Sequence, residues 1–112
     1  MIWYYGNENP DALIKKVRLG QVQHTLNFNV QPCDDVDGYA IRYQSVTLEP
    51  GVWGYDPIVN AIVCERYPAD KMQAVVNNFL ADQENEDAKT EMREMQEWRA
   101  FAKKVAKEAL TL

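Results

Sequence analysis

Four residues carry most of the chemistry that this sequence could offer, because the chain holds one histidine, His24, one serine, Ser45, and two cysteines, Cys33 and Cys64. A serine nucleophile needs a base within hydrogen-bond reach and a third group that orients the base. Ser45 stands in Gln-Ser-Val rather than on the sharp turn of a Gly-x-Ser-x-Gly motif, and no acid is marked as the orienting group. We therefore predict no catalytic residue and interpret His24 and Ser45 as a polar pair.

The two cysteines do not form a recognisable site. Cys33 and Cys64 lie far outside any Cys-x-x-Cys spacing. Cys33 follows His24 by nine residues of one extended strand, roughly 30 Å, so a Cys–His dyad is not expected there. No signal peptide opens the chain, which favours reduced thiols, although the residue count leaves one disulfide open.

An aspartate-rich turn is the one segment with the residue types of a metal site. Asp34, Asp35 and Asp37 precede Gly38 and offer the oxygen ligands that Ca²⁺ and Mg²⁺ take. The full pattern of a calcium loop is absent, and one histidine with two distant cysteines does not make a zinc site. We predict a turn here, with no metal and no cofactor.

Charge excludes several classes of partner. Seventeen acids against twelve bases give a net charge of −5, whereas nucleic acids and anionic membranes attract basic surfaces. Residues 82–97 are acidic and residues 98–112 basic, which matches the dipole of one helix. We expect a protein partner or self-association, no nucleic acid, no membrane, and a cytoplasmic location, or a virion location if the protein comes from a phage.

The clearest structural pattern is the strict alternation of apolar and polar residues over 21–31, which predicts a half-buried strand. A second β-rich segment over 39–48 follows the turn, so the two form an antiparallel hairpin. A register with Pro32 opposite Asp37 pairs Leu26 with Tyr43 and His24 with Ser45. Registers shifted by two residues keep the same faces.

Two further strands are expected upstream. Residues 2–5 form a short aromatic strand. Residues 12–19 are ambiguous, because Asn9-Pro10-Asp11 is a helix-start signal whereas the residues that follow alternate like a strand. We favour the strand, with Gly20 as a bulge or a tight bend.

The second half of the chain predicts three helices. Asp56 serves as an N-cap before Pro57, and Pro68 ends the first helix and starts the second. The last helix runs over about 87–110 and spans roughly 36 Å, the full diameter of a compact domain of this size. Packing against its own sheet is favoured, and pairing with a second chain stays open.

The prediction is therefore an α+β fold. An N-terminal antiparallel sheet, built on the 21–31/39–48 hairpin with one or two further strands, precedes three C-terminal helices, the last of them long. Residues 1–112 form one domain, with a β-rich half over 1–55 and a helical half over 56–112.

Aromatic and methionine side chains remain as candidates for a surface function. The loop 51–55 carries Trp53 and Tyr55 between glycines, where they either offer a docking surface or cap the core. The Asn/Gln face of the 21–31 strand offers a polar ligand surface or a solvated face. The candidate interaction surface consists of Trp3, Tyr5, Trp53, Tyr55, Met92, Met95 and Trp98.

Residues 61–80, with Glu-Arg-Tyr-Pro, and 95–109, with Gln-x-Trp-Arg, resemble the C-terminal halves of small uncharacterised proteins encoded in prophages and mobile elements of gut Bacteroidetes. The resemblance implies a phage-associated or accessory setting and carries no activity. We expect a non-catalytic interaction or assembly protein, with a dimer through the last helix left open. The alternative is a small-ligand or glycan-binding module that uses the Asn/Gln face and the loop aromatics.

Overall fold

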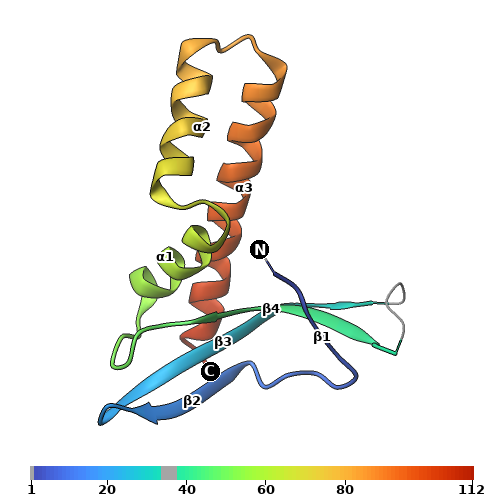
Figure 1. The fold of residues 1–112 in the computed structure, drawn as a ribbon, viewed down its shortest axis with the longest axis vertical. Helices are drawn as coiled ribbons and strands as arrows, with labels where there is room; N and C mark the ends of the chain where they lie inside the picture. The colour runs from blue at the N-terminus through green and yellow to red at the C-terminus, as the bar shows by residue number, and fades with distance from the viewer. Residues whose placement is uncertain (1, 34–37) are drawn as a thin grey trace.

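The structure, a computed structural model, describes residues 2–33 and 38–112 and has the predicted α+β fold (Figure 1). A four-stranded antiparallel sheet with the order β1-β4-β3-β2 precedes three helices, the last of them long. The elements are β1 (Tyr4–Gly6), β2 (Leu13–Arg18), β3 (Gln21–Pro32), β4 (Ile41–Thr47), α1 (Tyr55–Arg66), α2 (Ala69–Ala81) and α3 (Glu86–Ala109).

The ambiguous segment 12–19 is a strand, as favoured, because β2 pairs with β3 along its whole length from Leu13↔Leu26 to Arg18↔Gln21. Only Leu19 and Gly20 connect these strands, with φ angles of 54° and 75°. Two positive φ angles are typical of the tight turn whose twist matches that of a hairpin. Gly20 therefore marks the tight bend rather than a bulge.

The predicted register of the central hairpin is wrong. Leu26 faces Val46, three positions beyond the predicted partner Tyr43, and Asn27 faces Ser45. A shift by an odd number of residues exchanges the two faces of a strand. Gln44 and Val46 therefore lie on the same face as Leu26. The proposed opposition of Pro32 and Asp37 also fails, since Pro32 faces Ile41.

A β-bulge interrupts this hairpin between Phe28 and Gln31. Phe28 faces Gln44, but the next pair is Gln31 with Arg42, so β3 holds one residue more than β4 between these pairs. Asn29 takes up the distortion with a φ of 57°, a left-handed conformation that Asn tolerates better than most residues. The strict alternation in the sequence conceals this bulge.

The three helices differ in how they begin and in whether a side chain caps the first turn. Asp56 is not the N-cap of α1, contrary to the prediction, because the helix begins at Tyr55 after Gly54 and has no side-chain cap. Pro68 separates α1 from α2, as predicted. The first turn of α3 is capped by Asn85, whose Oδ1 accepts a hydrogen bond of 3.0 Å from the Ala88 amide.

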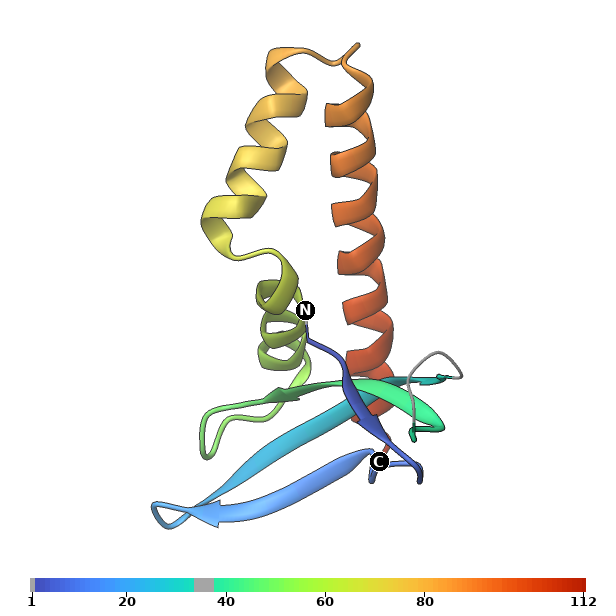
Figure 2. The ribbon, with the colours of Figure 1, turned by 45° about the vertical axis from the view of Figure 1, so that its right-hand side comes forward.

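The core lies between one face of the sheet and the helices α1 and α3 (Figures 1 and 2). Ile58 and Ile62 of α1 are fully buried beside Met95 of α3. The indole Nε1 of Trp98 donates a hydrogen bond of 3.0 Å to the Ile62 carbonyl and joins the two helices. The apolar seam of α3 is thus occupied by residues of its own chain.

The molecule is elongated, with extents of 47 × 38 × 23 Å and a radius of gyration of 16.4 Å, above the roughly 13 Å of a compact chain of this length. Figures 1 and 2 show the cause: α2 and the first half of α3 form a hairpin that stands away from the sheet, while the second half of α3 packs on it. The long helix both crosses the core and projects beyond it.

Candidate functional site

The turn between β2 and β3 carries the most exposed apolar side chains of the sheet. We call residues 14–22 the arm. Leu19 at its tip is 92% exposed, and the cross-strand partners Val17 and Val22 are 72% and 41% exposed. In both views the arm extends away from the α2–α3 hairpin (Figures 1 and 2). An apolar tip of this kind is a feature of interaction surfaces.

Leu19 is also in an unfavourable backbone conformation. The described positions with a left-handed φ are three glycines, Asn29 and Leu19. Gly and Asn are the ordinary residues for left-handed backbone, whereas a Leu there costs roughly 1–2 kcal/mol. The nearly complete exposure of Leu19 means that its side chain gains almost no burial in return. Strain without a local benefit is a feature of functional positions.

The base of the arm is held rigidly by the segment that follows β4. The Gly51 amide donates a hydrogen bond of 2.8 Å to the Val22 carbonyl. The side-chain amide of Gln23 donates a bond of 3.0 Å to the Leu48 carbonyl. The imidazole of His24 stacks on the indole of Trp53 with ring centroids 4.4 Å apart. Because its base is fixed, the arm loses little conformational entropy when it binds.

The arm is a basic segment of an acidic protein. Lys15, Lys16 and Arg18 stand on β2, and residues 12–23 contain no acid. β2 is an edge strand of the sheet. Lysine on an edge opposes pairing with an identical edge, because like charges would then face each other. The edge therefore disfavours a second β2 and favours an acidic surface.

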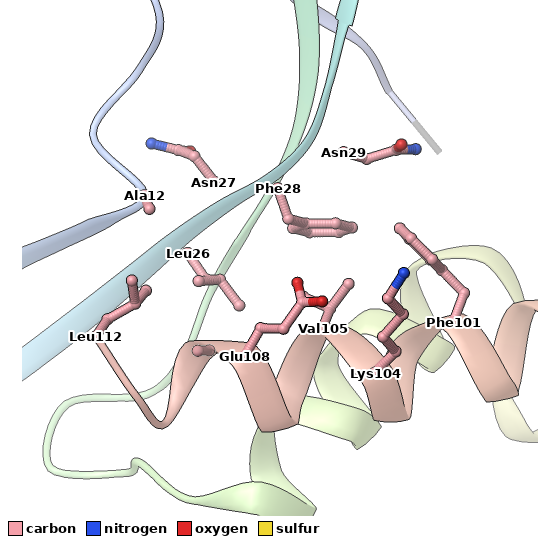
Figure 3. Close-up of a pocket in the computed structure, with 11 residues that line it drawn as sticks. Ala12, Leu26, Asn27, Phe28, Asn29, Phe101, Lys104, Val105, Glu108 and Leu112 are labelled. Atoms are coloured by element: carbon pink, nitrogen blue, oxygen red, sulfur yellow. The ribbon is translucent and has the colours of Figure 1, made fainter.

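A first hollow lies between β3 and the end of α3, and we call it the C-terminal hollow (Figure 3). It holds about 280 Å³, at the small end of known ligand pockets. Leu26 and Phe28 point from the strand toward Val105 of the helix, and Lys104 and Glu108 stand at its rim (Figure 3). The floor is apolar and the rim carries one charge of each sign.

A second hollow lies on the other side of Phe101, and we call it the aromatic hollow. It holds about 420 Å³ and is lined by Asn29, Arg66, Glu94, Glu97, Trp98 and Phe101. The rings of Trp98 and Phe101 are in contact, with centroids 5.5 Å apart and planes tilted by 39°. Glu94 and Glu97 give the helix side of this hollow an acidic rim, with Arg66 on the side of α1.

The bulge gathers amide side chains next to these hollows. Asn29 donates from Nδ2 to the Gln44 Oε1 at 2.9 Å and accepts from the Gln31 Nε2 at 3.0 Å. The Arg42 guanidinium donates to the Gln31 Oε1 and lies 4.1 Å above the Trp3 ring. This chain of contacts joins a buried Gln44 to the aromatic N-terminal strand.

The predicted Asn/Gln face is therefore divided between the two sides of the sheet. Before the bulge, Gln23 and Asn27 lie on the side away from the helices, and their amides donate to the Leu48 and Asp11 carbonyls. Beyond it, Asn29 and Gln31 belong to the network with Arg42. No single polar face runs along β3.

The seven residues of the predicted interaction surface are not brought together. Met95 and Trp98 are 1% and 7% exposed and lie in the core, with Met92 packed against it. Trp53 and Tyr55 are half-buried and also contact the core. Trp3 stacks on Arg42, and Tyr5, near Tyr39, is exposed.

Sequence reasoning missed the arm. Its signal is a Leu directly before a Gly, between two short β-rich segments. In the sequence, Leu19-Gly20 is typical of the last residue of a strand followed by a turn glycine. The unfavourable conformation of Leu19 is visible only in the backbone angles. The usual Asn-Gly of such a turn would have signalled it.

The nucleophile candidates are also separated. His24 lies on the core-facing side of β3, whereas Ser45 lies on the opposite face of β4, so the predicted His24–Ser45 pair does not form. Cys33 is buried, Cys64 is exposed, and both are free. Asp34, Asp35 and Asp37 fall outside the described residues. Over residues 2–33 and 38–112, no three His, Cys, Asp or Glu side chains gather as ligands of a metal.

No family model, curated protein or solved structure matches this chain. Among the described residues, none of the helices has the length and apolar character to cross a membrane.

Proposed function

We propose that this protein is a non-catalytic interaction protein that docks through the tip of its arm. The observation that carries the proposal is Leu19, an apolar side chain that is 92% exposed on a strained backbone. A partner pocket that buries a leucine gains about 2 kcal/mol, which is comparable to the strain.

The surroundings of Leu19 support a docking role. Val17 and Val22 extend the apolar surface below the tip, and Lys16 and Arg18 supply charge at its margin. The hydrogen bonds and the aromatic stack at the base of the arm keep this surface in one conformation. The sequence resemblance implies a phage-associated or accessory setting.

Photo-crosslinking in the cells that make the protein tests the proposal. A photoreactive amino acid replaces Leu19 in one variant and Leu80 in the control. Leu80 is 61% exposed on α2 and lies away from the arm. We expect a discrete adduct from position 19 that position 80 does not give. Equal adducts from both positions, or none from position 19, would contradict the proposal.

A second candidate function is binding of a small polar ligand such as a sugar. The amide chain Gln44–Asn29–Gln31–Arg42 beside the aromatic hollow favours it, since amides and aromatic rings together suit hydroxyl-rich ligands. Tryptophan fluorescence against a panel of sugars is the test, because Trp98 lines the hollow and Trp3 covers Arg42. We expect a saturable change that Arg42→Met weakens, and a flat response to every sugar would remove this candidate.

A further inference from the structure

We infer that the arm docks into the aromatic hollow of a second copy of this chain, so that copies associate head to tail; this inference rests on the proposed docking role of the arm. The arm supplies an apolar tip with Lys16 and Arg18 beside it. The hollow supplies the half-buried ring of Phe101, with Glu94 and Glu97 at its rim and the Arg66 guanidinium over the buried ring of Trp98. The tip of the arm thus carries two bases, the hollow carries two acids against one base, and both surfaces include apolar side chains.

Acidic and basic residues are unevenly distributed over the molecule. This distribution favours the contact between the arm and the aromatic hollow. Residues 82–97 hold seven acids and two bases, whereas residues 12–23 hold three bases and no acid. The C-terminal hollow has one base and one acid at its rim, Lys104 and Glu108, and does not attract a basic arm. Opposite potentials on facing surfaces speed encounter and fix orientation.

The contact cannot form within one molecule. The tip of the arm adjoins Gln21, and the hollow adjoins Asn29, eight residues further along the same strand. An extended strand of eight residues spans about 26 Å. Since β2 pairs with Gln21–Leu26 of β3 and β4 pairs with β3 from Thr25 onward, the strand stays extended and the tip reaches only the hollow of another copy.

The contact joins two different surfaces, so it is heterologous. Each copy has one arm and one aromatic hollow, and association therefore continues into a chain or closes into a ring. An arm of nine residues in one hollow buries less than the roughly 1,200 Å² of a stable complex. We therefore expect weak association, sensitive to protein concentration and to salt.

The inference is tested by sedimentation velocity on the purified chain, from about 10 μM to about 1 mM, a range that brackets weak interfaces. We expect the average mass to rise with concentration at low salt, and to fall again at about 0.5 M salt, where charge pairs are screened. A monomer at every concentration would overturn the inference.

Two charge-reversed variants make the test specific. The arm variant is Lys16→Glu/Arg18→Glu, and the hollow variant is Glu94→Lys/Glu97→Lys. Each alone should remain monomeric, because like charges then face each other. Their equimolar mixture should associate, since the acidic arm of one fits the basic hollow of the other. A mixture that stays monomeric would overturn the inference.

Controls separate docking from folding and from net charge. Glu8→Lys/Glu65→Lys changes the net charge as the hollow variant does, at two exposed positions outside both surfaces, and should associate like the wild type. Leu19→Asn should be monomeric although its fold is more stable, so unfolding cannot explain the loss. Association of Leu19→Asn at the wild-type level would overturn the inference.

The self-association and the docking role of the arm can fail separately in these experiments. If the purified chain stays monomeric while position 19 crosslinks to a different protein in cells, the second copy is wrong as the partner and the arm remains a docking element. If position 19 gives no adduct in cells and the purified chain is monomeric, both proposals fail.

Discussion

The imidazole of His24 lies flat on the indole of Trp53, with ring centroids 4.4 Å apart and ring planes 16° apart. The Nδ1 atom of His24 is buried and has no hydrogen-bond partner among the described residues. The single histidine therefore has a structural role: it fastens the base of the arm to the loop that precedes α1.

Two substitutions of His24 distinguish the stability that comes from the stack on Trp53 from the cost of the unpartnered Nδ1 atom. His24→Phe keeps an aromatic ring on Trp53 and removes a buried polar atom, whose desolvation costs about 1–3 kcal/mol. We expect the free energy of unfolding to stay the same or to rise by about 1 kcal/mol. His24→Ala should lower it by about 1–2 kcal/mol, because the stack is lost. Urea unfolding measures both, and a destabilised His24→Phe would show that Nδ1 has a partner.

The hydrogen bond from Trp98 to the Ile62 carbonyl makes a second prediction. Trp98→Phe removes this bond and leaves a small cavity between α1 and α3, so we expect a loss of about 2 kcal/mol in the free energy of unfolding. Trp3→Phe is the matched control, since Trp3 is half-buried and stacks on Arg42, and should cost about 0.5–1 kcal/mol. Equal losses in the two variants would show that the Nε1 bond contributes little.

The order and type of the elements could be predicted from the sequence, because they depend on local periodicity. The alternation over 21–31 and the 3–4 spacing from Ala88 to Ala109 each extend over many residues, and both elements formed as expected. The cap of α1 was misplaced by two residues, since Asp56-Pro57 fits an N-terminus at either position. Local patterns determine element boundaries less tightly than element types.

The register could not be predicted, because it depends on a bulge that leaves no periodic trace. Asn29 fits the polar phase of the strand as well as it fits the left-handed bulge position. The assumed tight turn after Pro32 placed the partners of Gln31 and Pro32 four positions short, and the bulge reduces this error to three positions for Thr25–Phe28. The unfavourable conformation of Leu19 is likewise a property of backbone angles and leaves no trace in the sequence. The arm and the divided Asn/Gln face therefore became visible only in the structure.

Gly51 holds the base of the arm and makes a third prediction. Its φ is 80°, and a Cβ there would lie 2.9 Å from the side chain of Gln21. Gly51→Ala should therefore lower the free energy of unfolding by about 1–3 kcal/mol. The double variant Gly51→Ala/Gln21→Ala should recover the part due to the clash, and thermal melts compare the two.

Gly6→Ala serves as the control for this substitution. Gly6 also lies in the sheet, but its added Cβ would meet only the Glu8 carbonyl at an ordinary 3.7 Å and its φ is not positive. Its effect should be within about 0.5 kcal/mol, as for most unstrained surface substitutions. If both glycine variants lost the same stability, the bracing role of Gly51 would be wrong.

Asn29 makes the last prediction, because strain and hydrogen bonding can be separated at its position. Asn29→Gly keeps a backbone that accepts the φ of 57° but loses the bonds to Gln44 and Gln31, so we expect a loss of about 1 kcal/mol. Asn29→Ala loses the same bonds and adds left-handed strain, for a total of about 2 kcal/mol. The difference between the two free energies of unfolding measures the strain at the bulge. If alanine proved equal to glycine, β3 would have shifted its register to remove the bulge, and amide hydrogen exchange along β4 would then change its pattern of protected residues.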